Sequence, residues 1–120
     1  MTNQRRILLL ESDENLRELL RMSLQLDGFE VISPDDGAEA QREIEQGGAD
    51  AVLSCVMFPS MDAFALLAWL REHNRMDVPV VILTCRALPD IREELLQAGA
   101  REVLFKPVRM SDLVDRLKAV

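Results

Sequence analysis

Five short apolar runs alternate with amphipathic segments along this chain of 120 residues, and that alternation restricts the fold more than any other feature. The runs have the length of strands and lie at residues 7–10, 29–32, 51–53, 78–83 and 103–104. Each run is followed by apolar residues at the three- and four-residue spacing of a helix, as Leu16, Leu19 and Leu20 show. The sequence therefore predicts five consecutive strand–helix units, (βα)5.

The predicted strands are continuous apolar runs that do not alternate with polar residues. Strands of this kind are buried on both faces, which is typical of a parallel sheet with helices on each side. Right-handed crossovers then give a three-layer, doubly wound α/β domain. Because no repeat, low-complexity tract or linker interrupts the pattern, we expect one domain over residues 1–120.

Charge and composition exclude several classes of function. A net charge of −7 argues against nonspecific binding to nucleic acid or to an anionic membrane, because both need a basic face. The apolar run at residues 7–10 is too short for a signal peptide or a membrane span, so we expect a cytoplasmic domain. His73 is the only histidine, and Cys55 and Cys85 form no CxxC motif, so no zinc site is expected.

In a doubly wound sheet the functional site lies beyond the carboxyl ends of the strands. The residues predicted at these ends are Glu11 to Asp13, Ser54 to Met57, Thr84-Cys85 and Phe105 to Pro107. Aspartate is a preferred N-cap, so we expect Asp13 to cap the first helix and not to bind a metal ion, with Ser12 as the alternative cap.

Segments around these positions resemble the receiver domains of two-component response regulators, and the resemblance covers the whole chain. The similar segments are residues 6–20, 50–64, 80–85 and 99–107, which includes a Lys-Pro turn. The resemblance implies a flavodoxin-like sheet with strand order 2-1-3-4-5. It also implies ancestry among domains that accept a phosphoryl group from a histidine kinase onto an aspartate.

The resemblance assigns roles by position. Cys55 stands where the family has the phosphoacceptor aspartate, and Glu11 and Ser12 stand where it has two acidic residues that hold Mg²⁺. Thr84 and Lys106 match the hydroxyl and ammonium groups that contact the phosphoryl group. Ser12 and Cys55 therefore depart from the family pattern.

The departures change the expected chemistry. Mg²⁺ prefers hard oxygen ligands in octahedral geometry, and the sulfur of Cys55 and the neutral hydroxyl of Ser12 suit it poorly. Glu11 is then the only anion, and Lys106 balances its charge. Val103 also replaces an aromatic residue whose rotation reports activation in the family. We expect a degenerate phosphorylation pocket with weak or absent Mg²⁺ binding, no other cofactor, no catalytic residue and no enzymatic activity.

Thr84 and Lys106 also have a purely structural interpretation, in which Thr84 satisfies a strand end and Lys106 pairs with Glu11. The family's Lys-Pro turn implies a cis Lys106-Pro107 bond, although only about 5–6% of X–Pro bonds in folded proteins are cis.

Three interpretations of Cys55 are open from the sequence. The first is a buried filler, since free cysteine is among the most buried residue types. The second is a redox or alkylation sensor, in which Cys55 and Cys85 emerge at adjacent strand ends and a nearby Lys106 favours the thiolate. The third is a cysteine phosphoacceptor, which lacks the metal that offsets phosphate charge.

The expected function is that of a pseudo-receiver, which binds a protein partner or a fused output domain through its fourth and fifth helices without phosphorylation. Leu88, Val108 and Arg109 are the exposed residues expected to contribute. The alternative is a working phosphorelay receiver with an unusual pocket, or redox sensing through Cys55 and Cys85.

Overall fold

The computed structural model describes residues 4–85 and 90–120, and within them it contains the five predicted strand–helix units. The elements are β1 (Arg6–Leu10), α1 (Glu14–Leu26), β2 (Glu30–Ile32), α2 (Gly37–Glu45), β3 (Ala51–Ser54), α3 (Ala63–Glu72), β4 (Val80–Thr84), α4 (Ile91–Ala98), β5 (Glu102–Phe105) and α5 (Met110–Ala119). The main difference from the sequence prediction is that β4 starts two residues later, after Pro79, and extends through Thr84. The predicted fold class is confirmed.

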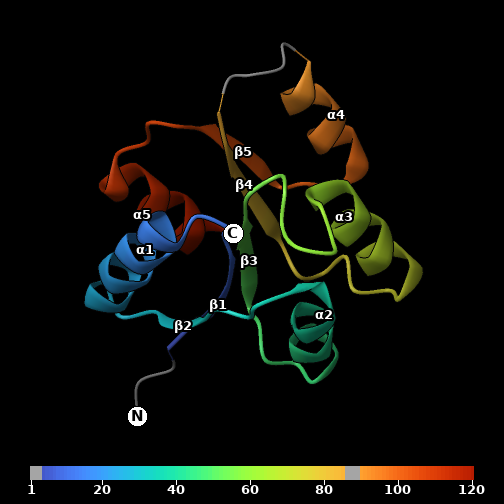
Figure 1. Ribbon diagram of the computed structural model, residues 1–120, viewed down its shortest axis with the longest axis horizontal. Coiled ribbons are helices and arrows are strands. Elements are labelled where there is room, and N and C mark those ends of the chain that lie inside the picture. Colours follow the sequence, from blue (N-terminus) through green and yellow to red (C-terminus); the bar gives the residue numbers. More distant parts are fainter. Residues whose placement is uncertain (1–3, 86–89) are drawn as a thin grey trace.

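The five strands form one parallel sheet in the order β2-β1-β3-β4-β5, as the family resemblance implied. Helices α1 and α5 cover one face of this sheet, and α2, α3 and α4 cover the other (Figure 1). In parallel strands the carboxyl ends lie at one edge of the sheet. The register brings Leu10 opposite Ser54 and Thr84 opposite Phe105, so the residues that follow these strands meet at that edge.

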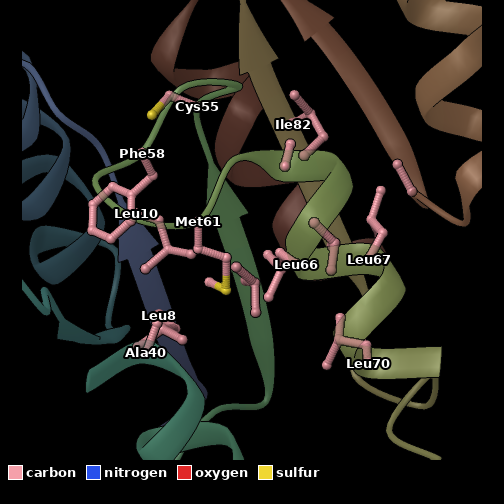
Figure 2. Close-up of a cluster of buried hydrophobic side chains, with 14 of the residues drawn as sticks. Leu8, Leu10, Ala40, Cys55, Phe58, Met61, Leu66, Leu67, Leu70 and Ile82 are labelled. Atoms are coloured by element: carbon pink, nitrogen blue, oxygen red, sulfur yellow. The ribbon is translucent and has the colours of Figure 1, made fainter. Parts of the chain in front are cut away.

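The two layers of helices enclose two hydrophobic cores. Alternate residues of the central strands point to opposite faces: in β1, Leu8 and Leu10 join the core beneath α2, α3 and α4, while Ile7 and Leu9 join the core beneath α1 and α5. This is why the strands read as continuous apolar runs. Figure 2 shows part of the first core, with Cys55 at one end of the cluster.

The loop between β3 and α3 is fastened to the start of α2. The backbone N–H of Gly37 donates to the carbonyl of Pro59 at 3.1 Å and to the hydroxyl of Ser60 at 3.2 Å. A Cβ atom at Gly37 would lie 2.5 Å from the Cβ of Met61, so this approach requires glycine. The contact holds in place the loop that follows Cys55.

No helix in residues 4–85 and 90–120 has the length and apolar character needed to cross a lipid bilayer.

Candidate functional site

The five pocket residues expected from the sequence all lie at or just beyond the carboxyl ends of their strands. Glu11 and Ser12 follow β1, Cys55 follows β3, Thr84 ends β4 and Lys106 follows β5. The backbone N–H of Cys55 donates to the carbonyl of Leu10 at 2.8 Å, which fixes the ends of β1 and β3 side by side.

Glu11 is the buried charge of this site. Glu11 as a whole is only 3% exposed, and its carboxylate has two partners. The Nζ atom of Lys106 lies 3.6 Å from Oε1, and the backbone N–H of Asp13 donates to Oε2 at 3.0 Å. The pairing of Lys106 with Glu11 is therefore confirmed, and it gives the carboxylate a cation from the chain itself.

Cys55 is buried, with 8% of its surface exposed. Its Sγ atom lies 3.2 Å from the carbonyl oxygen of Met57, to which the thiol donates, and 3.9 Å from the hydroxyl oxygen of Ser12. Burial raises the pKa of the Cys55 thiol, and the charge of Glu11 adds to this rise, while contacts with Ser12 and the charge of Lys106 act in the opposite direction. The thiol is therefore neutral near pH 7.

The redox-sensor interpretation expected Lys106 to favour the thiolate of Cys55. Lys106 does favour the thiolate of Cys55, but desolvation outweighs it. Cys85 is exposed, and both cysteines are free thiols. The buried-filler interpretation agrees with the observed burial of Cys55.

Thr84 and Lys106 are connected through the backbone. The backbone N–H of Lys106 donates to the carbonyl of Thr84 at 2.7 Å, whereas the hydroxyl of Thr84 lies 3.5 Å from the carbonyl oxygen of Cys85. The Lys106-Pro107 bond is cis, as the resemblance implied. Thr84 thus completes the strand end, in agreement with its structural interpretation.

Asp13 caps helix α1, as predicted. Its Oδ1 atom accepts from the backbone N–H groups of Asn15 at 3.0 Å and Leu16 at 3.2 Å. Two backbone contacts of the site could not be predicted from the sequence, because backbone groups carry no residue-type signal. They are the hydrogen bond from the N–H of Asp13 to Glu11 and the hydrogen bond from the thiol of Cys55 to the carbonyl of Met57.

The switch position and the residues expected on the docking face lie as follows. Val103 is buried in the core beneath α2, α3 and α4, with 4% of its surface exposed. Val108 was expected to be exposed, and this was wrong: it is half-buried and packs against the core beneath α1 and α5. Arg109 is exposed and precedes α5, and Leu88 lies outside the described residues.

A family model described as the response regulator receiver domain matches residues 7–118. The chain belongs to this family. The receiver domain is 36% identical over 115 residues to the transcriptional regulatory protein PrrA of Mycobacterium tuberculosis, covering 96% of this chain and 49% of that protein. It is 35% identical over 119 residues to the transcriptional regulatory protein GltR of Pseudomonas aeruginosa, covering 98% and 49%. The receiver domain thus spans about half the length of these relatives.

Solved structures of other receiver domains are also similar. The receiver domain of the sensor histidine kinase PA1611 from Pseudomonas aeruginosa is 30% identical, with a TM-score of 0.85 over 98% of this chain and 97% of that one. The receiver domain of RstA from Klebsiella pneumoniae is 25% identical, with a TM-score of 0.86 over 96% and 97%. The PA1611 structure has a magnesium ion coordinated in its active-site cleft.

The donor groups of this receiver domain fit a magnesium ion poorly. Both carboxylate oxygens of Glu11 already have partners, and Oδ1 of Asp13 is used by the helix cap. Ser12 and Cys55 contribute a neutral hydroxyl and a sulfur, which are poor ligands for this ion. Over the described ranges, no group of three or more His, Cys, Asp or Glu residues is placed to hold a metal ion.

Proposed function

We propose that this receiver domain is a pseudo-receiver, which acts in two-component signalling by binding a protein partner without being phosphorylated. The observation that carries the proposal is the Glu11–Lys106 ion pair beside a neutral thiol at residue 55. In this arrangement the buried carboxylate already has its cation, and the acceptor position has no anionic oxygen with which to attack phosphorus.

Charge neutralisation supports the same proposal. Phosphoryl transfer depends on positioning and on stabilisation of negative charge, to which Mg²⁺ normally contributes. Glu11 and Lys106 together carry no net charge, and the neutral Cys55 adds none, so the pocket attracts a dication weakly. We therefore expect Mg²⁺ binding to be weak or absent, and we assign no catalytic residue.

A second protein or domain is the natural partner for such a module. PrrA and GltR are transcriptional regulators about twice as long as this chain, so a fused output domain agrees with the coverage. We assign docking to the outer faces of α4 and α5. Two free cysteines agree with a reducing compartment, so we place the domain in the cytoplasm.

The proposal is tested by incubating the domain with acetyl phosphate and Mg²⁺ and measuring the intact mass. We expect no change in the intact mass of this domain. The receiver domain of PA1611, treated in parallel, serves as the comparison. A stable gain of one phosphoryl group would overturn the proposal. The variant Cys55→Ala would then locate the phosphoryl group. The variant abolishes modification of the thiol but leaves modification elsewhere unchanged.

A further inference from the structure

A cavity of about 310 Å³ lies at the edge of the sheet where β2 ends. We call it the β2–α2 cavity. Its lining includes Ile32, Ser33 and Pro34 from the end of β2 and the loop after it, and Glu39, Arg42 and Glu43 from α2. Ligand pockets have volumes of about 300–1,000 Å³, so this cavity suits a small molecule.

The hydroxyl of Ser33 is a polar group of this cavity that the fold leaves unsatisfied. Its Oγ atom is buried and has no hydrogen-bond partner among the described residues. A buried hydroxyl without a partner is unfavourable, because the group has lost its hydrogen bonds to water. Rotation about the Cα–Cβ bond moves Oγ between staggered positions, so the hydroxyl can turn toward an occupant. We therefore expect the occupant to carry a polar group.

Two carboxylates of the cavity lack a cation. Glu39 and Glu43 are half-buried and lie four residues apart in α2, so they share one face of the helix. Neither forms a salt bridge within residues 4–85 and 90–120. One oxygen of Glu39 accepts the backbone N–H of Asp35 at 3.0 Å, and this neutral donor leaves the charge uncompensated. Like charges at this spacing are unfavourable, so a cationic group between them would be stabilising.

Arg42 brings the opposite charge to the same cavity. It is exposed, and its guanidinium group forms no salt bridge with any residue that the structure describes. A planar guanidinium group binds a carboxylate through two parallel hydrogen bonds. The cavity therefore offers a partner for an anionic group as well as for a cationic one.

We propose that the β2–α2 cavity binds a small zwitterion of the amino-acid type. Its ammonium group lies between Glu39 and Glu43, and its carboxylate pairs with Arg42. Ser33 turns its hydroxyl to the same ligand, and Ile32 provides apolar surface for a short aliphatic side chain. The inference goes beyond the proposed function and does not depend on it, because none of the five phosphorylation-pocket residues lines this cavity.

Other small ligands match the lining less well. Two carboxylates supply too few oxygen atoms for Ca²⁺, which takes about 6–8 oxygen ligands. An inorganic anion would meet the charges of Glu39 and Glu43, and a simple amine would leave Arg42 without a partner. A zwitterion places a charge of the favourable sign against each of these side chains.

The test uses three probes of similar shape. L-valine carries both charged groups, 3-methylbutanoate lacks the ammonium group, and 2-methylpropylamine lacks the carboxylate. Backbone amide shifts of the isotope-labelled domain are followed by NMR during each titration. We expect L-valine to shift the amides of Ser33, Glu39 and Glu43 in a saturable manner, and the other two probes to bind at least about tenfold more weakly.

Three results would overturn the inference. Titration with L-valine that shifts no amide, or only amides outside the cavity, would show that the cavity does not bind a zwitterion. Equal affinity for 2-methylpropylamine would assign the cavity to cations alone. Equal affinity for 3-methylbutanoate would assign it to carboxylates alone.

Matched variants test the two charge pairings. Arg42→Gln and Glu43→Gln should each weaken L-valine about tenfold, because each removes a charge-assisted hydrogen bond. Arg101→Gln and Glu45→Gln change exposed residues outside the lining and should leave the affinity unchanged. An unchanged affinity in either cavity variant would overturn the assignment of a zwitterion.

The role of Ser33 is separable from the stability of the fold. Ser33→Ala should weaken L-valine about threefold, yet it should not lower the melting temperature, because the hydroxyl has no partner in the ligand-free protein. A lower melting temperature with unchanged affinity would contradict the contact of Ser33 with the ligand.

Discussion

The ammonium nitrogen of Lys106 lies 3.6 Å from Oε1 of Glu11, and this ion pair joins the end of β5 to the end of β1. Two strands, β3 and β4, separate these ends in the sheet. The side chain of Glu11 is only 4% exposed, whereas that of Lys106 is 28% exposed. The charge of the carboxylate is therefore stabilised mainly by its protein partners, while water also stabilises the charge of the ammonium group.

Removing Lys106 should destabilise the domain. Lys106→Met leaves the Glu11 carboxylate buried without its cation, and we expect a loss of about 1–3 kcal/mol in the free energy of unfolding, measured by urea denaturation. The double variant Glu11→Gln with Lys106→Met should recover most of this loss. Arg116→Met is the matched control, because the Arg116–Glu102 pair has the same 3.6 Å separation but more exposed side chains. An effect as large in the control would show that the burial of Glu11 is not the cause.

The two thiols should differ in reactivity. Cys85 is exposed, whereas Cys55 is buried and has a raised pKa, so Cys85 should react quickly with a thiol reagent near neutral pH and Cys55 slowly. Reaction with dithionitrobenzoate measures both rates. Cys85→Ser should remove the fast phase and Cys55→Ser the slow one; the opposite assignment would contradict the burial of Cys55.

The raised pKa of Cys55 also predicts how stability depends on pH. Below the ordinary thiol pKa of about 8.5 the group is protonated in both the folded and the unfolded state, so its contribution is fully present. As the pH rises, the unfolded state loses this proton first, so the native state binds more protons and stability falls until the folded pKa is passed. Urea denaturation between about pH 8 and about pH 10 should show a smaller decline for Cys55→Ala than for the parent. Equal declines would mean that Cys55 does not cause this pH dependence.

Restoring the acidic residues should restore cation binding. Ser12→Asp combined with Cys55→Asp places two further carboxylates near Glu11, because the side chains of Ser12 and Cys55 lie 3.9 Å apart. We expect calorimetric titration with Mg²⁺ to give a binding signal for this variant and little or none for the parent. Ser12→Asn with Cys55→Asn is the neutral control of similar shape. Comparable Mg²⁺ affinity in the parent would argue against a degenerate pocket.

The contact between Gly37 and Met61 predicts that residue 37 is sensitive to side-chain size. Gly37→Ala places a Cβ atom 2.5 Å from the Cβ of Met61, so either α2 or the loop after β3 must move. We expect a loss of about 1–3 kcal/mol in the free energy of unfolding, measured by thermal or urea denaturation. Ala38→Gln at the neighbouring exposed position should cost less than about 0.5 kcal/mol. If the two variants were equally stable, the close approach would not limit the site.

The strand–helix order, the parallel sheet and the edge at which the pocket residues meet could all be predicted from the sequence. It could do so because apolar spacing repeats within single elements, and because the carboxyl ends of parallel strands must lie together. The N-cap at Asp13 was predictable for the same reason, since its partners are the next residues of the chain.

The exposure of individual side chains and the contacts between them depend on how the elements pack, so they could not be predicted from the sequence. Burial, and not the neighbouring Lys106, determines the direction in which the pKa of the Cys55 thiol shifts. No local sequence pattern reports how deeply a residue is buried after folding. Val108 proved half-buried because the core beneath α1 and α5 extends to it. A groove between β5 and α5, lined among others by Leu104, Asp112 and Asp115, forms only because the strand and the helix pack together, since its lining comes from separate elements of the chain.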